Sequence, residues 1–350
     1  MVENLNRRKF LQVGSVAVGA TALAGCLGDD DEEEEFPNRT LQLVNHYSEG
    51  GGLDQNFREL QPFWEEQIDG TWSQTYQPGA GTRNGISYMI NNTDPDMHSV
   101  GMLDGVSMAS ARAFDVADDS REPVFSPEQI EYIGSLTSET TIIRIREDED
   151  RFSDINEFVE YVQDNPGEVV MGSSGPTNRF SQAGIQLIDA LDLDMRIVPY
   201  DGGGPVETAL LQEEVDVIPR GVYNSRSIEN DSTAIAMYWD ENNWTEITND
   251  APAINDALGL DLEYGPTVGA NVYYTTAEAA ENHPDRYETM VDTFEAAGTS
   301  EDYLASLDNV DEFERGKVDV QGPEYARNLV EEGIETYSDF VPLFQQYVED

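Results

Sequence analysis

Hydrophobic and polar residues alternate along this chain in a pattern that predicts strands and helices in turn. A strand over residues 40–47 precedes a glycine-rich turn and an amphipathic helix over about 53–67. A strand over 72–77, a helix ending near residue 91 and a strand over 98–103 follow. Repeated strand–loop–helix units of this kind predict a mainly parallel sheet that is covered by helices.

A second series begins after two predicted strands, 131–136 and 140–146, which we expect to meet where the chain crosses between two lobes. In the helix that starts near residue 155, apolar residues recur at the spacing of one helix face, and Pro166 ends it. The segments predicted next are a strand over 169–173, a helix over 178–190, a strand over 195–200, a helix over 205–212, and strands over 215–219 and 233–239.

A strand over 268–275 is expected to return the chain to the first lobe, followed by helices over 277–297 and from 323 onward. Pro342 should kink or end the last helix. The predicted fold is therefore α/β, with two lobes that each contain a mainly parallel sheet and flanking helices. The boundaries predicted for the two lobes are 39–140 plus 268–350 for the first and 141–267 for the second.

The chain is strongly acidic. Its formal net charge is −51, from 70 acidic and 19 basic residues, so no basic stripe is present that could bind nucleic acid. Disorder is one interpretation of the acidity, but 39% hydrophobic residues with 16 Tyr and 13 Phe favour a folded protein. At about 1 M salt the Debye length is only about 3 Å, so the composition indicates a halophilic protein in which self-repulsion is screened.

The first 26 residues have the pattern of an export signal. Arg7 and Arg8 form a twin-arginine motif, and the apolar stretch 13–24 is shorter than the roughly 20 residues that span a bilayer. The stretch ends in a lipobox, which predicts that Cys26 is lipidated and anchors the protein to the outer face of the cell membrane. The alternative is a buried N-terminal helix with a chance cysteine.

Residues 27–38 are predicted to form an acidic tether, because the unbroken acidic run 29–35 repels itself and extends the chain. A cation site is the alternative interpretation of this run. Cys26 is the only cysteine, which excludes an intrachain disulfide and a catalytic thiol in the mature protein. The three histidines, His46, His98 and His283, have no metal-ligand spacing, so we expect no metal and no cofactor.

Candidate chemistry lies in four glycine-rich loops, two in each half, at the carboxyl ends of predicted strands, where ligands of open α/β sheets bind. Glycines let the backbone approach a ligand, and the helices that follow offer unpaired N–H groups. The first loop, 47–54, has no lysine, so a phosphate-binding P-loop is excluded. The candidate ligand-binding residues are Tyr47, Ser48, Gly51, Gly52, Asp54, Pro78, Gly79, Ala80, Gly81, Arg83, Ser173, Ser174, Gly175, Thr177, Arg179, Tyr200, Gly202, Gly203 and Arg220.

Together these loops resemble the substrate-binding receptors of tripartite tricarboxylate transporters, the Bug or TctC type, over most of the chain from Arg39 to about Val348. The residues that match the family's signatures are Tyr47, Gly50, Gly51 and Asp54; Pro78, Gly79, Ala80 and Gly81; Gly172, Ser173 and Gly175; Val198, Pro199, Tyr200, Gly202 and Gly203; and Val215 and Asp216. Gln77 and Thr82 depart from the second signature, and Arg220 stands where relatives usually carry an acidic or small residue.

The resemblance implies a type II periplasmic-binding-protein fold, a two-lobed flytrap that grips a small carboxylate-bearing solute through backbone amides and ordered water. Its implied partners are the membrane subunits of a tripartite transporter, and the receptor itself is expected to be a monomer. Arg220 is either salt-bridged or directed at the ligand. If Arg179 or Arg220 contacts a dicarboxylate, replacing it with alanine should weaken binding by about 1–3 kcal/mol.

Two other functions stay open at this point. A sensory receptor that signals to a membrane kinase would have the same sequence features. An exported hydrolase is the less favoured alternative, because Gly172–Gly175 lacks the G-x-S-x-G spacing of a nucleophile elbow. His46 precedes the first loop and could either support the ligand or pack in the core.

Overall fold

The structure is a computed structural model that describes residues 36–118, 120, 122–175, 178–200, 202–238, 242, 244–262, 269–310 and 313–347. The predicted export signal with Cys26, the acidic run 29–35 and the candidate residue Thr177 lie outside the described residues. Within the described part of the chain, no helix is both long enough and apolar enough to cross a membrane.

Six strands form the first sheet, in the order β11-β4-β10-β3-β1-β2. Their bounds are Leu41–Asn45 (β1), Trp72–Tyr76 (β2), Ser99–Asp104 (β3), Ile130–Glu139 (β4), Gly269–Thr276 (β10) and Val318–Gln321 (β11). β1 is parallel to β2 and β3, whereas β10 is antiparallel to β3 and β4. Asp104 pairs with Asn271, so the carboxyl end of β3 lies beside the start of β10.

Five strands form the second sheet, in the order β7-β6-β8-β5-β9. Their bounds are Thr141–Arg146 (β5), Val170–Ser173 (β6), Arg196–Pro199 (β7), Val217–Gly221 (β8) and Ser232–Met237 (β9). β6 is parallel to β7 and β8, but β5 is antiparallel to both β8 and β9. Both sheets are therefore mixed. Most strands of each sheet run in one direction, but β10 and β11 run against β4 in the first sheet, and β5 runs against both of its neighbours in the second.

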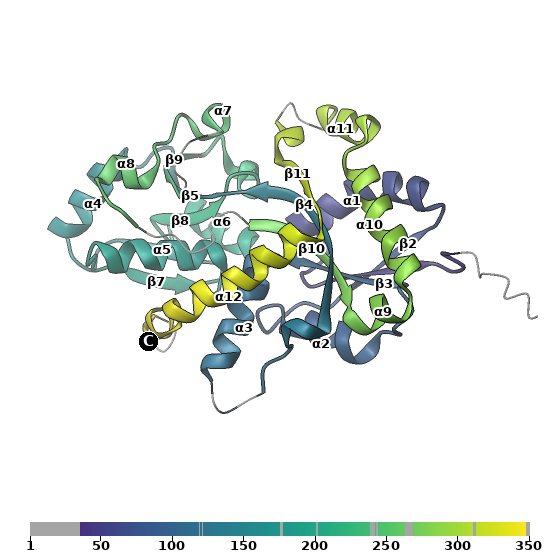
Figure 1. Cartoon of the computed structure of the whole chain (residues 1–350). Coiled ribbons are helices and arrows are strands. Elements are labelled where there is room, and N and C mark those ends of the chain that lie inside the picture. The colour runs from purple at the N-terminus through teal and green to yellow at the C-terminus, as the bar shows by residue number, and fades with distance from the viewer. Residues whose placement is uncertain are drawn as a thin grey trace, which may run out of the picture. The chain divides into compact units, whose positions relative to one another are not determined.

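Helices flank both sheets (Figure 1). The α-helices are Gly52–Ile68 (α1), Arg83–Asn92 (α2), Gly105–Ala117 (α3), Ile155–Asp164 (α4), Arg179–Ala190 (α5), Gly203–Leu211 (α6), Thr245–Thr248 (α7), Ile254–Leu258 (α8), Ala277–Asn282 (α9), Pro284–Gly298 (α10), Glu301–Asp308 (α11) and Pro323–Gln346 (α12). Three 3₁₀ turns cover Pro127–Gln129 (η1), Arg226–Ile228 (η2) and Glu314–Lys317 (η3). The helix predicted over 277–297 is divided at Pro284, which cannot donate a backbone hydrogen bond and instead begins α10.

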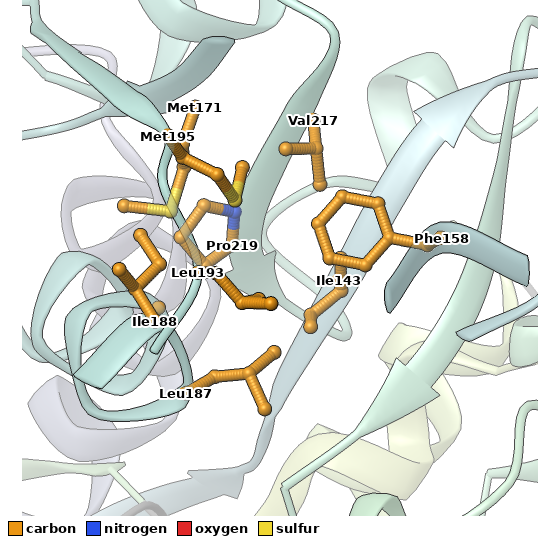
Figure 2. Close-up of a pocket in the computed structure, with 10 residues that line it drawn as sticks. Ile143, Phe158, Met171, Leu187, Ile188, Leu193, Met195, Val217 and Pro219 are labelled. Carbon is orange, nitrogen blue, oxygen red and sulfur yellow. The ribbon is translucent and has the colours of Figure 1, made fainter. Parts of the chain in front are cut away.

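The buried core has one part on each face of the first sheet. On one face, Trp64 of α1 packs edge-on against Tyr273 of β10 and Phe294 of α10, with ring centroids 5.8 and 5.2 Å apart. On the other face, α12 packs on α3 and β4 (Figure 1). This second part continues into the core of the second sheet, where Ile143, Met171 and other apolar side chains of the sheet face α4 and α5 (Figure 2).

The last helix does not end at Pro342, although the sequence pattern allowed that outcome. α12 continues to Gln346, and Pro342 lies inside it. A proline cannot donate to the carbonyl of the preceding turn, but Val341 and Phe344 are almost fully buried. Phe344 stacks on Phe114 of α3, with ring centroids 6.2 Å apart. Tertiary packing of the apolar face thus outweighs the missing hydrogen bond.

Candidate functional site

Each of the four glycine loops runs from a strand end into the first residue of a helix. The helices begin at Gly52, Arg83, Arg179 and Gly203. Every loop also contains at least one glycine in the left-handed region, with φ of 82° at Gly50, 104° at Gly79, 107° at Gly175 and 101° at Gly202. Only glycine adopts such angles without a steric penalty, so the sequence of each loop is matched to its turn.

Asp54 holds the first loop in shape. Its buried carboxylate accepts hydrogen bonds from the Gly50 backbone at 2.8 Å, the Arg58 guanidinium at 3.0 Å and the Tyr76 hydroxyl at 2.9 Å. Burial opposes the charge, but these three donors hold the pKa of Asp54 below its usual value. Ser48 and Gly51 close the turn, because the Gly51 N–H donates to the Ser48 carbonyl. Asp54 therefore orders the backbone that would face a ligand.

The side chains of Arg83 and Tyr200 are held by carboxylates outside the candidate set, although Arg83 Nη1 also donates to the Ala80 carbonyl at 3.0 Å. The Arg83 guanidinium donates to Asp115 at 2.7 Å and to the Ala111 carbonyl at 2.9 Å, which ties the second loop to α3. The Tyr200 hydroxyl donates to Glu214 at 3.2 Å. Within the second loop, Pro78 accepts a hydrogen bond from the side chain of Asn84, at the start of α2.

The remainder of the second loop has an unusual backbone. Ala80 and Thr82 have φ of 51° and 71°, and Gly81 lies between them with φ of 60°. Side-chain-bearing residues in this region cost about 1–3 kcal/mol each and are concentrated at functional sites. The Thr82 hydroxyl is buried and has no hydrogen-bond partner among the described residues.

Arg179 connects the two sheets. It is the first residue of α5, on the second sheet, and its Nε donates to Asp104 at the end of β3 on the first sheet, 3.1 Å away. Its Nη2 donates to Glu139, the last residue of β4, also at 3.1 Å. All three side chains are buried or nearly so. Tyr47 lies beside Asp104 and Arg179, where burial raises the pKa of its hydroxyl.

Glu139 is enclosed by donors. Its carboxylate accepts hydrogen bonds from the backbone N–H groups of Tyr223 and Asn224, at 3.0 and 3.3 Å, from the Asn224 side chain, and from Arg179. Burial nevertheless raises the pKa of Glu139 above its usual value. A side chain built on Gly52 would contact Asn224, so the start of α1 also lies against this group.

Arg220 is salt-bridged inside the same network. Its guanidinium donates to Glu207 of α6 at 2.6 and 2.8 Å and to the Asn224 carbonyl at 3.2 Å. A side chain on Gly203 would overlap the Arg220 guanidinium, which explains the need for glycine there. The network thus contains two guanidinium groups, of Arg179 and Arg220, and three carboxylates, and each cation already has an anionic partner.

The third and fourth loops are held by internal hydrogen bonds and have open space beside one glycine each. The Ser173 hydroxyl donates to Ser181 at 2.9 Å, and the Ser174 backbone donates to the same oxygen at 3.0 Å. The Ser174 hydroxyl is buried without a partner among the described residues. A Cβ added at Gly175 or Gly202 would meet no atom within 4 Å. Open space therefore lies beside Gly175 and Gly202. The backbone N–H groups of Ser174, Gly175 and Gly202 already donate hydrogen bonds within the loops.

Four residues of the network, Asp104, Glu139, Glu207 and Asn224, are absent from the set predicted from sequence. Asp104 carries the one recognisable signal, a carboxylate that ends the fully buried strand β3. His46 packs under Gly85 of α2 and contacts Tyr274, with Nε2 to hydroxyl oxygen 3.2 Å. Burial lowers the pKa of His46 to about 3, so this histidine occupies a core position.

Comparison with known proteins agrees with this architecture, although the chain matches no known family profile. A UPF0065 protein of Cupriavidus necator is 24% identical over 210 residues, which cover 59% of this chain and 61% of that protein. The chain thus spans about three fifths of the length of this curated relative.

Similar solved structures cover more of the chain. They include the periplasmic binding protein BugD, with a TM-score of 0.72, 18% identity, and coverage of 89% of this chain and 99% of that one. MatC from Rhodopseudomonas palustris with bound malate has a TM-score of 0.69, 18% identity, and coverage of 87% and 99%. A second protein of that organism, with adipate, has a TM-score of 0.74, 15% identity, and coverage of 89% and 98%. The predicted two-lobed, type II periplasmic-binding-protein fold is confirmed.

The ion pairs of Arg179 predict a large effect on stability. Replacing Arg179 with glutamine leaves Asp104 and Glu139 buried without their cation, which should lower the free energy of unfolding by about 3–5 kcal/mol. Arg315→Gln is the control, because its ion pairs with Glu301 and Asp308 are exposed and should contribute no more than about 1 kcal/mol. Urea unfolding in molar salt measures both, and equal losses would contradict a buried network.

His46 predicts a dependence of stability on pH. Its pKa is about 3 in the folded protein and near 6.5 when exposed, so below pH 6.5 the unfolded chain binds the extra proton. The stability that the fold gains from keeping His46 neutral is fully present above pH 6.5. As the pH falls toward 5, the free energy of unfolding decreases by about 1.4 kcal/mol per pH unit. Between pH 7 and 5, the free energy of unfolding should therefore depend less steeply on pH in His46→Gln than in the unmodified protein. Identical slopes would exclude a neutral, buried His46.

Proposed function

We propose that this protein is an exported solute-binding receptor that captures a small dicarboxylate and delivers it to a membrane transporter of the tripartite tricarboxylate type. The observation that carries the proposal is the meeting of the first loop and the starts of α5 and α6, from two different sheets, around Arg179 and Arg220. The malate and adipate bound to structures of similar fold support a dicarboxylate as the solute class.

Short-range donors, and not the net charge, would provide the affinity. A charge of −51 repels an anion at long range, but concentrated salt screens that field. Helix N-termini at the loops present N–H groups, which bind carboxylates well once water is excluded. Because Arg179 and Arg220 already hold internal carboxylates, a solute carboxylate would share these cations with Asp104, Glu139 and Glu207 or replace one of them.

Opening of the receptor would separate the two sheets. We assign the lobes to residues 39–140 plus 268–350 and to residues 141–267, with hinges at the crossings near Thr140 and near Val268, which lies outside the described residues. The contacts between Arg179 and Asp104, and between the start of α1 and Asn224, would break on opening. A bound solute would then stabilise the closed form, because its contacts come from both lobes.

The hydrogen bonds of the serines in the third loop favour a receptor over a hydrolase. Activation of a serine nucleophile requires an adjacent base. The Ser173 hydroxyl is instead bonded to another hydroxyl, of Ser181, and His46 lies in the core against Tyr274. No catalytic role is therefore assigned to these loops.

The place of action follows from the N-terminal sequence. We propose that the chain is exported through its twin-arginine signal and held at the outer face of the membrane by lipid on Cys26, in a saline environment. Mass spectrometry of the membrane fraction should find a mature chain that begins at a lipidated Cys26. An intact N-terminus, or a chain cleaved elsewhere, would refute the anchor.

Thermal shift and calorimetry in molar salt test the solute class. A solute at 1,000 times its dissociation constant raises the free energy of unfolding by about 4 kcal/mol. Malate, adipate and other dicarboxylates are compared with amino acids and aromatic acids. We expect stabilisation by at least one dicarboxylate, and no response to any carboxylate would contradict the proposal.

Gly51→Val tests the position of the site. Gly51 and Gly322 are both exposed N-caps with nearly the same backbone, φ −76° at Gly51 and −77° at Gly322, so valine fits either without left-handed strain. Gly51→Val should weaken dicarboxylate binding at least about tenfold, which is 1.4 kcal/mol. Gly322→Val, at the start of α12, should bind like the unmodified protein. Equal affinity for both variants would place the solute elsewhere.

A further inference from the structure

Arg144 is a buried cation that the proposed solute site does not use. It lies on β5 and is 2% exposed. Its Nε donates to the Ser225 hydroxyl at 2.8 Å and its Nη1 to the Ser232 hydroxyl at 3.1 Å. Its Nη2 has no hydrogen-bond partner among the described residues. In contrast to Arg179 and Arg220, it has no carboxylate within 4.0 Å in the described part of the chain.

A cavity of about 160 Å³ lies beside this guanidinium. Polar side chains of β9, of the turn after η2 and of the segment around α7 line it, together with the ring of Phe313 just before η3. The cavity is on the opposite face of the second sheet from the apolar core in Figure 2, because Ile143 lines that core and successive strand residues alternate between faces. The lining includes none of the glycine-loop residues.

The two carboxylates with the strongest electrostatic effect on Arg144 are bonded to other arginines. Glu229 has the strongest Coulombic effect on Arg144, but its carboxylate accepts a hydrogen bond from Arg226 at 3.0 Å. Glu207 is bonded to Arg220 at 2.6 Å. Burial lowers the pKa of Arg144 to about 10, which still leaves the guanidinium charged at neutral pH. A buried charge without a counterion is strongly destabilising, so an anion from solution would be held here.

We propose that the cavity beside Arg144 is a second binding site, for a small monovalent inorganic anion of the chloride type. The volume exceeds the roughly 30 Å³ share of one water molecule several times, so the anion would keep part of its hydration. Glu229 and Glu246 also line the cavity, and their charge disfavours a dianion such as a dicarboxylate. The site would use the abundant anion of a saline medium to balance a charge that the fold leaves unpaired.

Arg144→Met should fold, because the partners of the guanidinium keep other hydrogen bonds. The Ser225 hydroxyl donates to the Gly221 carbonyl and the Ser232 hydroxyl to the Ile228 carbonyl, both at 2.7 Å. Replacing a buried charge with an apolar side chain of similar length is often neutral or stabilising. Without chloride, the variant should therefore be at least as stable as the unmodified protein.

The test compares anions at one sodium concentration. The unfolding midpoint of the unmodified protein should rise by about 2 °C or more when gluconate, a bulkier organic anion, is replaced by chloride or bromide. Arg144→Met should lose this difference, and Arg144→Lys, which keeps the charge, should retain part of it. Bromide soaked into crystals should give an anomalous peak beside Arg144.

Two results would overturn the proposal. Equal chloride responses in the unmodified protein and Arg144→Met would mean that chloride acts only by general screening. A larger stabilisation by acetate than by chloride, lost in Arg144→Met, would make the cavity a carboxylate site. Neither result bears on the dicarboxylate site at the glycine loops, which Gly51→Val tests separately.

Discussion

The contact of Arg179 with Asp104 and Glu139 is the interaction on which the rest of the site depends. The guanidinium belongs to the second sheet, and the two carboxylates end strands of the first. Removing one member of such a buried group costs several kcal/mol, although the intact group contributes less because its charges are desolvated. Its main effect is therefore geometric, since it fixes where the starts of α5 and α1 lie relative to each other.

Two glycines outside the four loops make room for this contact. Gly269 has no side chain because one would overlap Arg179 and Asp104, and Gly221 has none because one would overlap Glu139. Because these glycines have no side chain, charged side chains can pack where the strands end. Acidic residues thus have two roles in this protein. Among the described residues, most are exposed or partly exposed, and a few neutralise arginines inside the fold.

Local sequence patterns predicted much of this architecture. The strands up to β10 and the starts of α1, α2, α5 and α6 follow from hydrophobic spacing and glycine turns, which act over a few residues. The directions of β5 and β10 could not be predicted from local sequence, because their antiparallel pairing arises from contacts between distant segments. The ion-pair partners of the arginines could not be predicted from local sequence either. Arg179 is separated from Asp104 by 75 positions, and no local spacing relates them.

In the proposed mode of binding, loops from both sheets hold a carboxylate around Arg179. A crystal structure of the protein with its tightest-binding dicarboxylate tests this most directly. One solute carboxylate should lie within hydrogen-bond distance of backbone N–H groups at the starts of α1 and α5 or α6, with Arg179 or Arg220 beside it. A solute bound to one sheet only, or away from both arginines, would contradict the claim.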